Sequence, residues 1–455
     1  MRLRRSEGRQ RLWRSRHGDE QESDQKPVTP RLRRSLFAWG LIDQALSSAT
    51  TFLFTLIAAR SLGPAGLGTI ALGYASFLVV LGIHRSLLVE PLVTRVATTT
   101  RSTSEAFKAA ISTTATGGAL ASLVALAVGL VGTGAVARGM LVFFPWFVPA
   151  LLQALLRSWL YREGLGAVAT VSSGAWLLTM VGAVTVGLRS TDWQITAAWG
   201  LGACVAVAVA GAGTGIGLAP PRAAGAWFNY EAFRVSGWRT TSSIVFSAAT
   251  YARVSGMSAI LGPAAVGGYR SVESIFAPTS LIGPALANPG TPMMRVAVER
   301  GGAPAWTLAL KISALSTGLV LAYIVPITLA RDLVLLLFGA SFSEYESLIL
   351  PIAVGALIGG MGTGFTILLL AARRMNELGL VVLVNSALTL ALTLPLAALF
   401  GLEAAAWGIV LGAFPPLLMI VVIARRTARE LEAVRRDAGL VETRVPLASA
   451  PDHSS

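Results

Sequence analysis

Two stretches of this sequence align without a gap: SLGPAGLGTIALGYASF at residues 61–77 and ILGPAAVGGYRSVESIF at residues 260–276. Both begin with a Leu-Gly-Pro-Ala turn, and both carry a glycine a few residues later, at Gly68 and Gly267. Glycine before proline is also a common way to begin a helix, which accounts for one such stretch without any repeat. Two copies in corresponding places favour an internal repeat.

A second match supports the repeat. Ala-Ala-Trp-Gly occurs at residues 197–200 and again at 405–408, each time near the start of a long apolar run. We therefore predict two halves of six helices each, joined by a linker at 217–236. Because each half has an even number of spans, the halves run in the same sense and are related by an axis along the membrane normal.

The composition indicates that lipid surrounds most of the chain. Hydrophobic residues make up 54% and charged residues 13%, against roughly 45–50% and 25% in soluble domains. At about 20 apolar residues per span, spans are expected near residues 36–60, 66–88, 109–134, 139–160, 166–188, 194–216, 237–260, 264–294, 304–329, 348–371, 377–400 and 402–424. The predicted fold class is all-α: a polytopic membrane protein of about 12 transmembrane helices in two pseudo-symmetric six-helix bundles.

The predicted domains follow from these spans. They are a basic cytoplasmic tail at 1–34, an N-terminal bundle at 35–216, a cytoplasmic linker at 217–236, a C-terminal bundle at 237–424 and a cytoplasmic tail at 425–455, which begins with a short amphipathic helix at 424–437. Arginine and lysine are commoner in one set of alternate loops, which places both termini on the cytoplasmic side of the inner membrane. The basic tails suit anionic membrane lipids, and their lack of interleaved aromatic residues argues against nucleic acid.

Cysteine and histidine are too scarce for a metal or cofactor site. Cys204 is the only cysteine and the three histidines are far apart, so neither a disulfide framework nor a metal cluster is expected. The sequence also lacks the G-x-x-x-x-G-K-[ST] loop that binds nucleotide phosphates. We therefore expect no cofactor, no metal and no catalytic residue.

Charged residues inside the predicted spans are the candidate functional residues, because each costs roughly 2.5–3.5 kcal/mol to insert at the bilayer centre. Arg253 and Arg270 lie at about the same depth on either side of a tight hairpin, about 10 Å below the outer surface at the rise of a helix. Two guanidinium groups at one depth suit a pyrophosphate. Alternatively, Arg270 pairs with Glu273 one turn away, and Arg253 extends to the lipid headgroups.

Three further charges lie closer to the cytoplasmic side. Arg85, next to His84 near the inner end of the second span, is either a third substrate-binding arginine or an ordinary interfacial anchor. Asp43 and Lys311 both lie about 10 Å inside the cytoplasmic face. They are candidates for coupling or gating together with Glu273, either as a pair or as separate proton or cation sites.

Helix-breaking residues are concentrated in the eighth predicted span. It contains four prolines, Pro278, Pro284, Pro289 and Pro292. Such a span is expected to be bent or interrupted, which lipid tolerates only where protein or a cavity satisfies the freed backbone groups. A packing kink is the simpler explanation, but a kinked helix beside Arg270 and Glu273 also suits a gating element.

The sequence resembles the polysaccharide and lipid-linked oligosaccharide flippases of the multidrug/oligosaccharidyl-lipid/polysaccharide exporter superfamily. The residues that carry the resemblance are LGPAGLG at 62–68, its copy LGPAAVG at 261–267, LLLFGASFSEYESLILPIAV at 335–354 and FGLEAAAWGIVLG at 400–412. The resemblance is one of pattern over residues 36–424.

The resemblance implies a V-shaped pair of six-helix bundles around a cationic cavity. The implied substrate is a sugar on an undecaprenyl-type pyrophosphate, which moves from the inner to the outer leaflet, and a polysaccharide polymerase and export machinery are implied partners. Arg253 matches a position where these flippases often keep a charge, although Tyr-Ala-Arg replaces the commoner acidic-basic pair. Because Asp43 is the only charge in the first span, an exopolysaccharide or antigen repeat unit is favoured over a peptidoglycan precursor.

Other functions remain open at this point. A drug/cation antiporter of the same superfamily would use Asp43 or Glu273 to bind H⁺ or Na⁺. A membrane glycosyltransferase or polymerase would need a long outer loop with paired acidic residues, and the first outer loop is only a few residues long. A scaffold without transport does not explain charges kept inside the spans.

Overall fold

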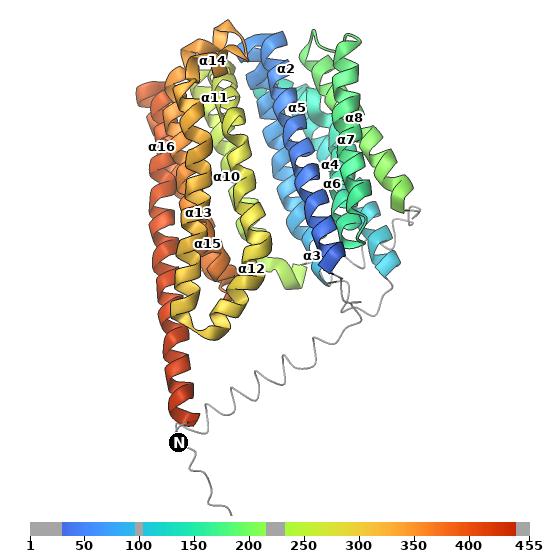
Figure 1. Ribbon diagram of the computed structural model, residues 1–455. Helices are drawn as coiled ribbons and strands as arrows, with labels where there is room; N and C mark the ends of the chain where they lie inside the picture. The colour runs from blue at the N-terminus through green and yellow to red at the C-terminus, as the bar shows by residue number, and fades with distance from the viewer. Residues whose placement is uncertain (1–29, 96–102, 215–232, 443–455) are drawn as a thin grey trace, which may run out of the picture.

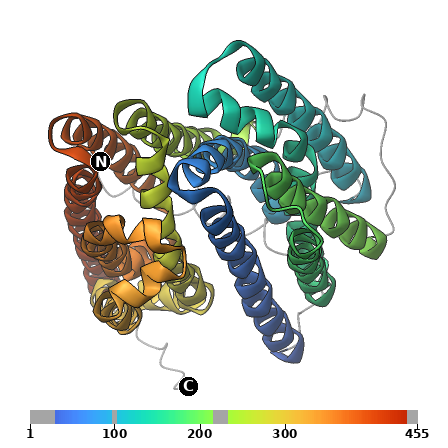
Figure 2. The ribbon, with the colours of Figure 1, turned by 90° about the horizontal axis from the view of Figure 1, so that it is seen from above.

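The computed structural model describes residues 30–95, 103–214 and 233–442, which are almost entirely helical and contain no strand. The helices stand side by side in two groups (Figure 1). We call the described residues 30–214 the N-terminal half and residues 233–442 the C-terminal half. Seen from above, the two groups lie next to each other and meet along one side (Figure 2).

The N-terminal half is built from long apolar helices with short connections. Its elements are α2 (Pro30–His84), the π-helix η1 (Arg85–Val89), α3 (Glu90–Arg95), α4 (Thr103–Val131), α5 (Gly134–Phe143), the 3-10 turn η3 (Phe144–Trp146), α6 (Phe147–Arg162), α7 (Gly166–Thr185) and α8 (Asp192–Thr214). The single turn η3 lies between α5 and α6, which together form one span, Gly134–Arg162.

The C-terminal half has a similar series of helices. Its elements are α10 (Phe233–Leu261), α11 (Pro263–Phe276), the 3-10 segment η5 (Ala277–Leu281), α12 (Ile282–Arg300), α13 (Gly302–Leu329), α14 (Arg331–Leu336), the 3-10 segment η6 (Ala340–Leu348), α15 (Ile349–Ala371) and α16 (Met375–Glu442). The amphipathic helix expected at 424–437 is continuous with the last span, because α16 runs on to Glu442.

Two of these helices reverse direction at a glycine. In α2, Gly63 adopts φ 68° and ψ −173°, and in α16, Gly401 adopts φ 85° and ψ −165°. The rings of Phe54 and Tyr74 lie 6.4 Å apart, whereas a straight helix would separate them by about 30 Å. Each of these two helices is therefore a hairpin of two spans.

The number of spans agrees with the prediction. Nine segments of the described chain are long and apolar enough to cross a membrane. Two of these nine are the hairpins that turn at Gly63 and Gly401, and the interrupted segment α11–η5–α12 is a further span outside the nine. The described chain is thus a polytopic all-α membrane protein with the expected set of about 12 spans.

The eighth span is interrupted as predicted. The α-helical pattern stops at Phe276, continues as 3-10 helix through Ala277–Leu281 and resumes at Ile282. Pro278 lies in the 3-10 segment, where its missing N–H and its ring prevent regular α-helical hydrogen bonding. The break follows one turn after Glu273, so the 3-10 segment that joins α11 to α12 lies close to charged residues.

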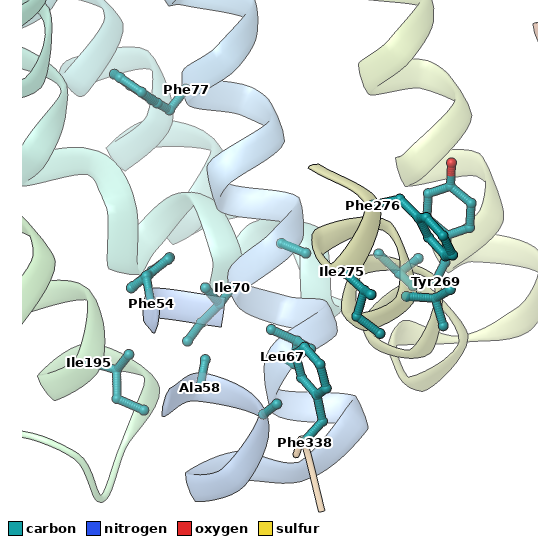
Figure 3. Close-up of a cluster of buried hydrophobic side chains, with 14 of the residues drawn as sticks. Phe54, Ala58, Leu67, Ile70, Phe77, Ile195, Tyr269, Ile275, Phe276 and Phe338 are labelled. Carbon is teal, nitrogen blue, oxygen red and sulfur yellow. The ribbon is translucent and has the colours of Figure 1, made fainter. Parts of the chain in front are cut away.

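Three clusters of buried apolar side chains hold the helices together. One cluster lies within the N-terminal half and includes Phe107 and Trp159, whose rings stack at 4.1 Å. A second cluster lies within the C-terminal half and includes Met294 and Ala424. The largest joins the halves, with Phe54 and Phe77 from one side and Ile275 and Phe276 from the other (Figure 3).

The matched glycines Gly68 and Gly267 form a reciprocal contact between the halves. A Cβ on Gly68 would lie 1.8 Å from the carbonyl oxygen of Pro263, and a Cβ on Gly267 would lie 1.9 Å from that of Pro64. Any other residue would force the two helices apart at these points. The repeated motif thus places two helix starts in backbone contact at the upper end of the molecule in Figure 1.

Further contacts close the same end. Arg60 donates a hydrogen bond from Nε to the carbonyl oxygen of Leu337 at 2.7 Å, and the rings of Phe52 and Phe338 meet edge to face at 6.0 Å. Below this end, α10 packs along α2, whereas α12 packs on α13 and α15 of its own half. The halves are therefore joined at the hairpin end and along α2 and α10.

The predicted domain limits stay predictions. The linker at 217–236 lies mostly outside the described residues, as do most of the tail at 1–34 and the end of the tail at 425–455.

Candidate functional site

The N-terminal half contains a cavity of about 250 Å³ between α2, η1, α6, α7 and α8. We call it the N-half cavity. Its polar wall includes Gln44, Ser47, Arg85, Gln153 and Arg157. Its aromatic wall consists of Tyr74, Phe77, Trp176 and Trp199.

Arg157 is the centre of a buried polar network in this cavity. Its Nε lies 2.8 Å from Oδ2 of Asp43, and its two terminal nitrogens donate to Ser47 Oγ and Gln44 Oε1, each at 3.2 Å. Ser173 Oγ donates to the second Asp43 oxygen at 2.5 Å. The Asp43 carboxylate, with its side chain 2% exposed, is therefore paired and hydrogen-bonded on both oxygens.

Arg85 and His84 point to different environments although they are neighbours. Arg85 is exposed and lines the N-half cavity, at the first residue of the π-helix η1. His84 is buried, and its Nε2 lies 2.9 Å from Thr114 Oγ1 on α4. His84 is therefore not an interfacial anchor, and Arg85 remains a candidate for substrate binding because its side chain borders the cavity.

The C-terminal half contains a second cavity, of about 410 Å³, between η5 and helices α10, α11, α15 and α16. We call it the C-half cavity. Arg253, Arg270 and Glu273 supply its charges, and the rest of its wall is largely apolar or weakly polar, as with Ile352 and Ala406.

Arg253 and Arg270 have different partners in the C-half cavity. Arg270 Nη1 lies 2.6 Å from Glu273 Oε2, one helical turn away. Arg253 Nε is fully buried and has no hydrogen-bond partner among the described residues. A buried donor without a partner is costly, and Arg253 also lines the cavity, so its guanidinium group is a candidate contact for a bound anion.

The two cavities meet at Tyr74. Its ring lines the N-half cavity, and the guanidinium carbon of Arg270 lies 5.3 Å from the centre of that ring. The distance is within the range of a cation–π contact. Arg270 therefore belongs to the wall of one cavity and contacts the wall of the other.

The structure places the predicted site residues in two groups. Arg253, Arg270 and Glu273 lie together, and Arg270 makes the ion pair with Glu273 that was the alternative to an anion site. Arg85 lies in the other cavity. Asp43 pairs with Arg157, whereas Lys311 is exposed on α13, and no ion pair joins Lys311 to Asp43 in the described part of the chain. Asp43 and Lys311 therefore do not form the suggested gate pair in this structure.

Sequence reasoning missed Arg157 and Gln153. Both lie inside the span expected at 139–160, four residues apart, so they share one face of a helix. That spacing was the available signal. Arg157 lies close to the end of the span, where a basic residue is ordinarily an interfacial anchor.

The described residues offer no metal site. No group of three or more His, Cys, Asp or Glu side chains lies close enough there to hold an ion.

Comparisons with known proteins define the class of fold. No protein-family model matches the chain, and no curated protein sequence matches it either. Solved structures do match over most of its length, and all of those described below are membrane transporters of one architecture. The chain has the fold of the transporters of the MOP superfamily.

Three of these structures illustrate the range. An inward-facing multidrug resistance transporter of the MATE family is 15% identical, with a TM-score of 0.66, over 86% of this chain and 99% of that one. The lipid II flippase MurJ, in an inward closed conformation, is 10% identical, with a TM-score of 0.67, over 89% and 92%. A MOP-superfamily transporter from Pyrococcus furiosus, described by the reverse polarity of its binding pocket, is 13% identical, with a TM-score of 0.56, over 87% and 95%.

Proposed function

We propose that the chain is a flippase that moves a polyprenyl-pyrophosphate-linked oligosaccharide, such as an exopolysaccharide or antigen repeat unit, from the inner to the outer leaflet of the cytoplasmic membrane. Both termini are proposed to be cytoplasmic. A polysaccharide polymerase and export machinery are the proposed partners that receive the product.

One observation carries this proposal: each half has a cavity with two arginines and one carboxylate, and the two cavities meet at the Tyr74–Arg270 contact. Each cavity therefore has a net positive charge of about one. A pyrophosphate diester carries two negative charges and matches the pair of cavities. The polyprenyl tail would stay in lipid, because the apolar outer surface of the helices already faces it.

Pairing of the carboxylates argues against the antiporter alternative. A drug/cation antiporter needs a carboxylate that is available to an incoming cation. Asp43 is occupied by Arg157 and Ser173, and Glu273 is occupied by Arg270. An incoming anion, by contrast, can compete with the more exposed Glu273 for Arg270, which gives Glu273 a gating role.

The membrane potential can supply the driving force. With the inside negative, outward movement of an anion gains about 2.3 kcal/mol per charge per 100 mV. A pyrophosphate head therefore needs no nucleotide hydrolysis to move outward.

The experiment that tests the proposal is a leaflet-resolved assay in proteoliposomes that contain a fluorescent undecaprenyl-pyrophosphate sugar. We expect wild-type protein to expose the label to a membrane-impermeant quencher, and the double variant Arg253→Ala/Arg270→Ala to lose this activity at unchanged membrane level. Arg426→Ala, which removes an exposed charge on α16, is the matched control. Equal label exposure in the double variant and in wild type would remove both arginines from the site, and equal exposure in protein-free vesicles would refute the flippase.

A further inference from the structure

Gln153 is a buried amide that lacks a partner in the N-half cavity. Its residue is only 4% exposed, it lines the cavity, and it makes no hydrogen bond among the described residues. Because its amide atoms have no partner in the described helices and are not fully enclosed, they face the open space of the cavity. Leaving such an amide unsatisfied is unfavourable, which indicates that the ligand of this cavity supplies its hydrogen bonds.

Aromatic rings form another part of the cavity wall. Trp176 and Trp199 lie 5.1 Å apart, and Trp176 Nε1 donates to the carbonyl oxygen of Trp199 at 2.9 Å, which fixes its ring. Tyr74 meets Trp199 edge to face at 6.2 Å. A rigid aromatic surface and an open amide in one cavity suit a ligand with one apolar face and a rim of hydroxyl groups.

Arg157, one of the two arginines of this cavity, is less available to a pyrophosphate than Arg253 of the C-half cavity. All three nitrogens of Arg157 are engaged by Asp43, Gln44 and Ser47. In the C-half cavity, Arg253 Nε has no partner among the described residues. Arg85 is then the remaining arginine of the N-half cavity, so the pyrophosphate is assigned to the C-half cavity and a hydroxyl-bearing group to the Gln153 side of the N-half cavity.

We propose that the N-half cavity binds one sugar ring of the substrate head and that Gln153 is the residue that selects it. The proposal rests on the proposed flippase function and adds where the sugar and the pyrophosphate bind. The cavity volume of about 250 Å³ is below the roughly 300–1,000 Å³ of sites for drug-sized ligands, so it holds one ring and not a whole oligosaccharide. The ring stacks on Trp176 or Trp199, and the Gln153 amide bonds a hydroxyl or acetamido group.

The test measures binding to the full-length protein in lipid nanodiscs. The probes are undecaprenyl pyrophosphate without sugar and its glucosyl, galactosyl and N-acetylglucosaminyl forms. We expect wild type to bind at least one glycosylated probe about tenfold tighter than the sugar-free probe, since tenfold corresponds to one well-placed hydrogen bond. Gln153→Leu should reduce that ratio to about one and leave the affinity for the sugar-free probe unchanged.

Two further variants keep the test decisive. Gln153→Asn retains an amide on a shorter side chain and should give an intermediate ratio of glycosylated to sugar-free affinity. This variant provides the test if Gln153→Leu fails to fold. Gln194→Leu, which removes an amide from the first turn of α8, is the matched control and should bind as wild type does.

The outcomes separate this inference from the proposed function. If Gln153→Leu keeps the sugar preference, or if wild type shows none, the N-half cavity is not a sugar site, although binding of the sugar-free probe can still support the flippase. If no probe binds and Arg253→Ala/Arg270→Ala changes nothing, the flippase proposal fails as well.

Discussion

The N-half and C-half cavities occupy matched places in the repeat but use their charges differently. Phe77 and Phe276, which align in the two repeated stretches, each line the cavity of their own half. In the N-half cavity, the ion pair is enclosed, with the Asp43 side chain 2% exposed. In the C-half cavity, the Glu273 side chain is 38% exposed. The comparison indicates that the polar wall of the N-half cavity is fixed, whereas that of the C-half cavity is adjustable.

The difference in burial determines how much each pair contributes. Removing one partner of a buried ion pair costs about 3–5 kcal/mol, because the remaining charge is left without compensation. An exposed pair is worth about 0–1 kcal/mol, because solvent screens it and long side chains lose freedom when they are held together. Equivalent substitutions in the two halves should therefore have unequal effects.

Asp43→Ala should give the largest effect. It leaves the partly buried Arg157 guanidinium without its counter-charge, so we expect a loss of about 3 kcal/mol in unfolding free energy and a clear fall in Tm, measured by thermal unfolding in detergent. The double variant Asp43→Ala/Arg157→Leu removes both charges and should recover most of the Tm, but not transport. A single variant as stable as wild type would contradict the idea of a fixed polar wall.

Gly68→Ala and Gly267→Ala should give the next largest effect, on conformation. Each added Cβ meets a carbonyl oxygen of the other half, and relieving such overlap typically costs about 1–3 kcal/mol. Both variants should therefore favour a state in which the two halves are separated at the end where α2 contacts α11. Distances between spin labels at Arg60 and Leu337, in a protein with Cys204→Ser, will measure this.

Two comparisons make the glycine test specific. Gly117→Ala is the matched control, because a Cβ there meets nothing within 4 Å, and it should leave the distance distribution unchanged. The two glycine variants should also shift the distribution equally if the contact is as symmetric as the repeat. An unchanged distribution in both would show that this contact does not hold the end closed.

The sequence predicted the fold better than the site, for a physical reason. Spans follow from the length of apolar runs and breaks follow from proline and glycine, both of which are local properties, as the turns at Gly63 and Gly401 and the break at Pro278 illustrate. Partners of buried charges are set by packing between distant helices. Sequence position therefore suggested Lys311 as the partner of Asp43, whereas α6 supplies Arg157.

Neighbours within one helix were predictable for the same reason. Arg270 and Glu273 are one turn apart, and their ion pair could be proposed from spacing alone. The contact of Arg270 with Tyr74, which joins the cavities, depends on how the halves meet. No pattern within either half carries that information.

Glu273→Gln should give the smallest change in stability and is the most direct test of an adjustable wall. Because the pair is partly exposed, we expect less than about 1 kcal/mol of change in unfolding free energy, in contrast to Asp43→Ala. The substitution frees Arg270 while the amide keeps nearly the same shape, so sugar-free undecaprenyl pyrophosphate should bind severalfold tighter and dissociate more slowly. Affinity measured in nanodiscs, with Glu377→Gln on α16 as the matched control for loss of an acidic partner, will decide this. Weaker binding in Glu273→Gln would mean that the carboxylate orients Arg270 toward the anion, and the C-half cavity would then be as fixed as its counterpart.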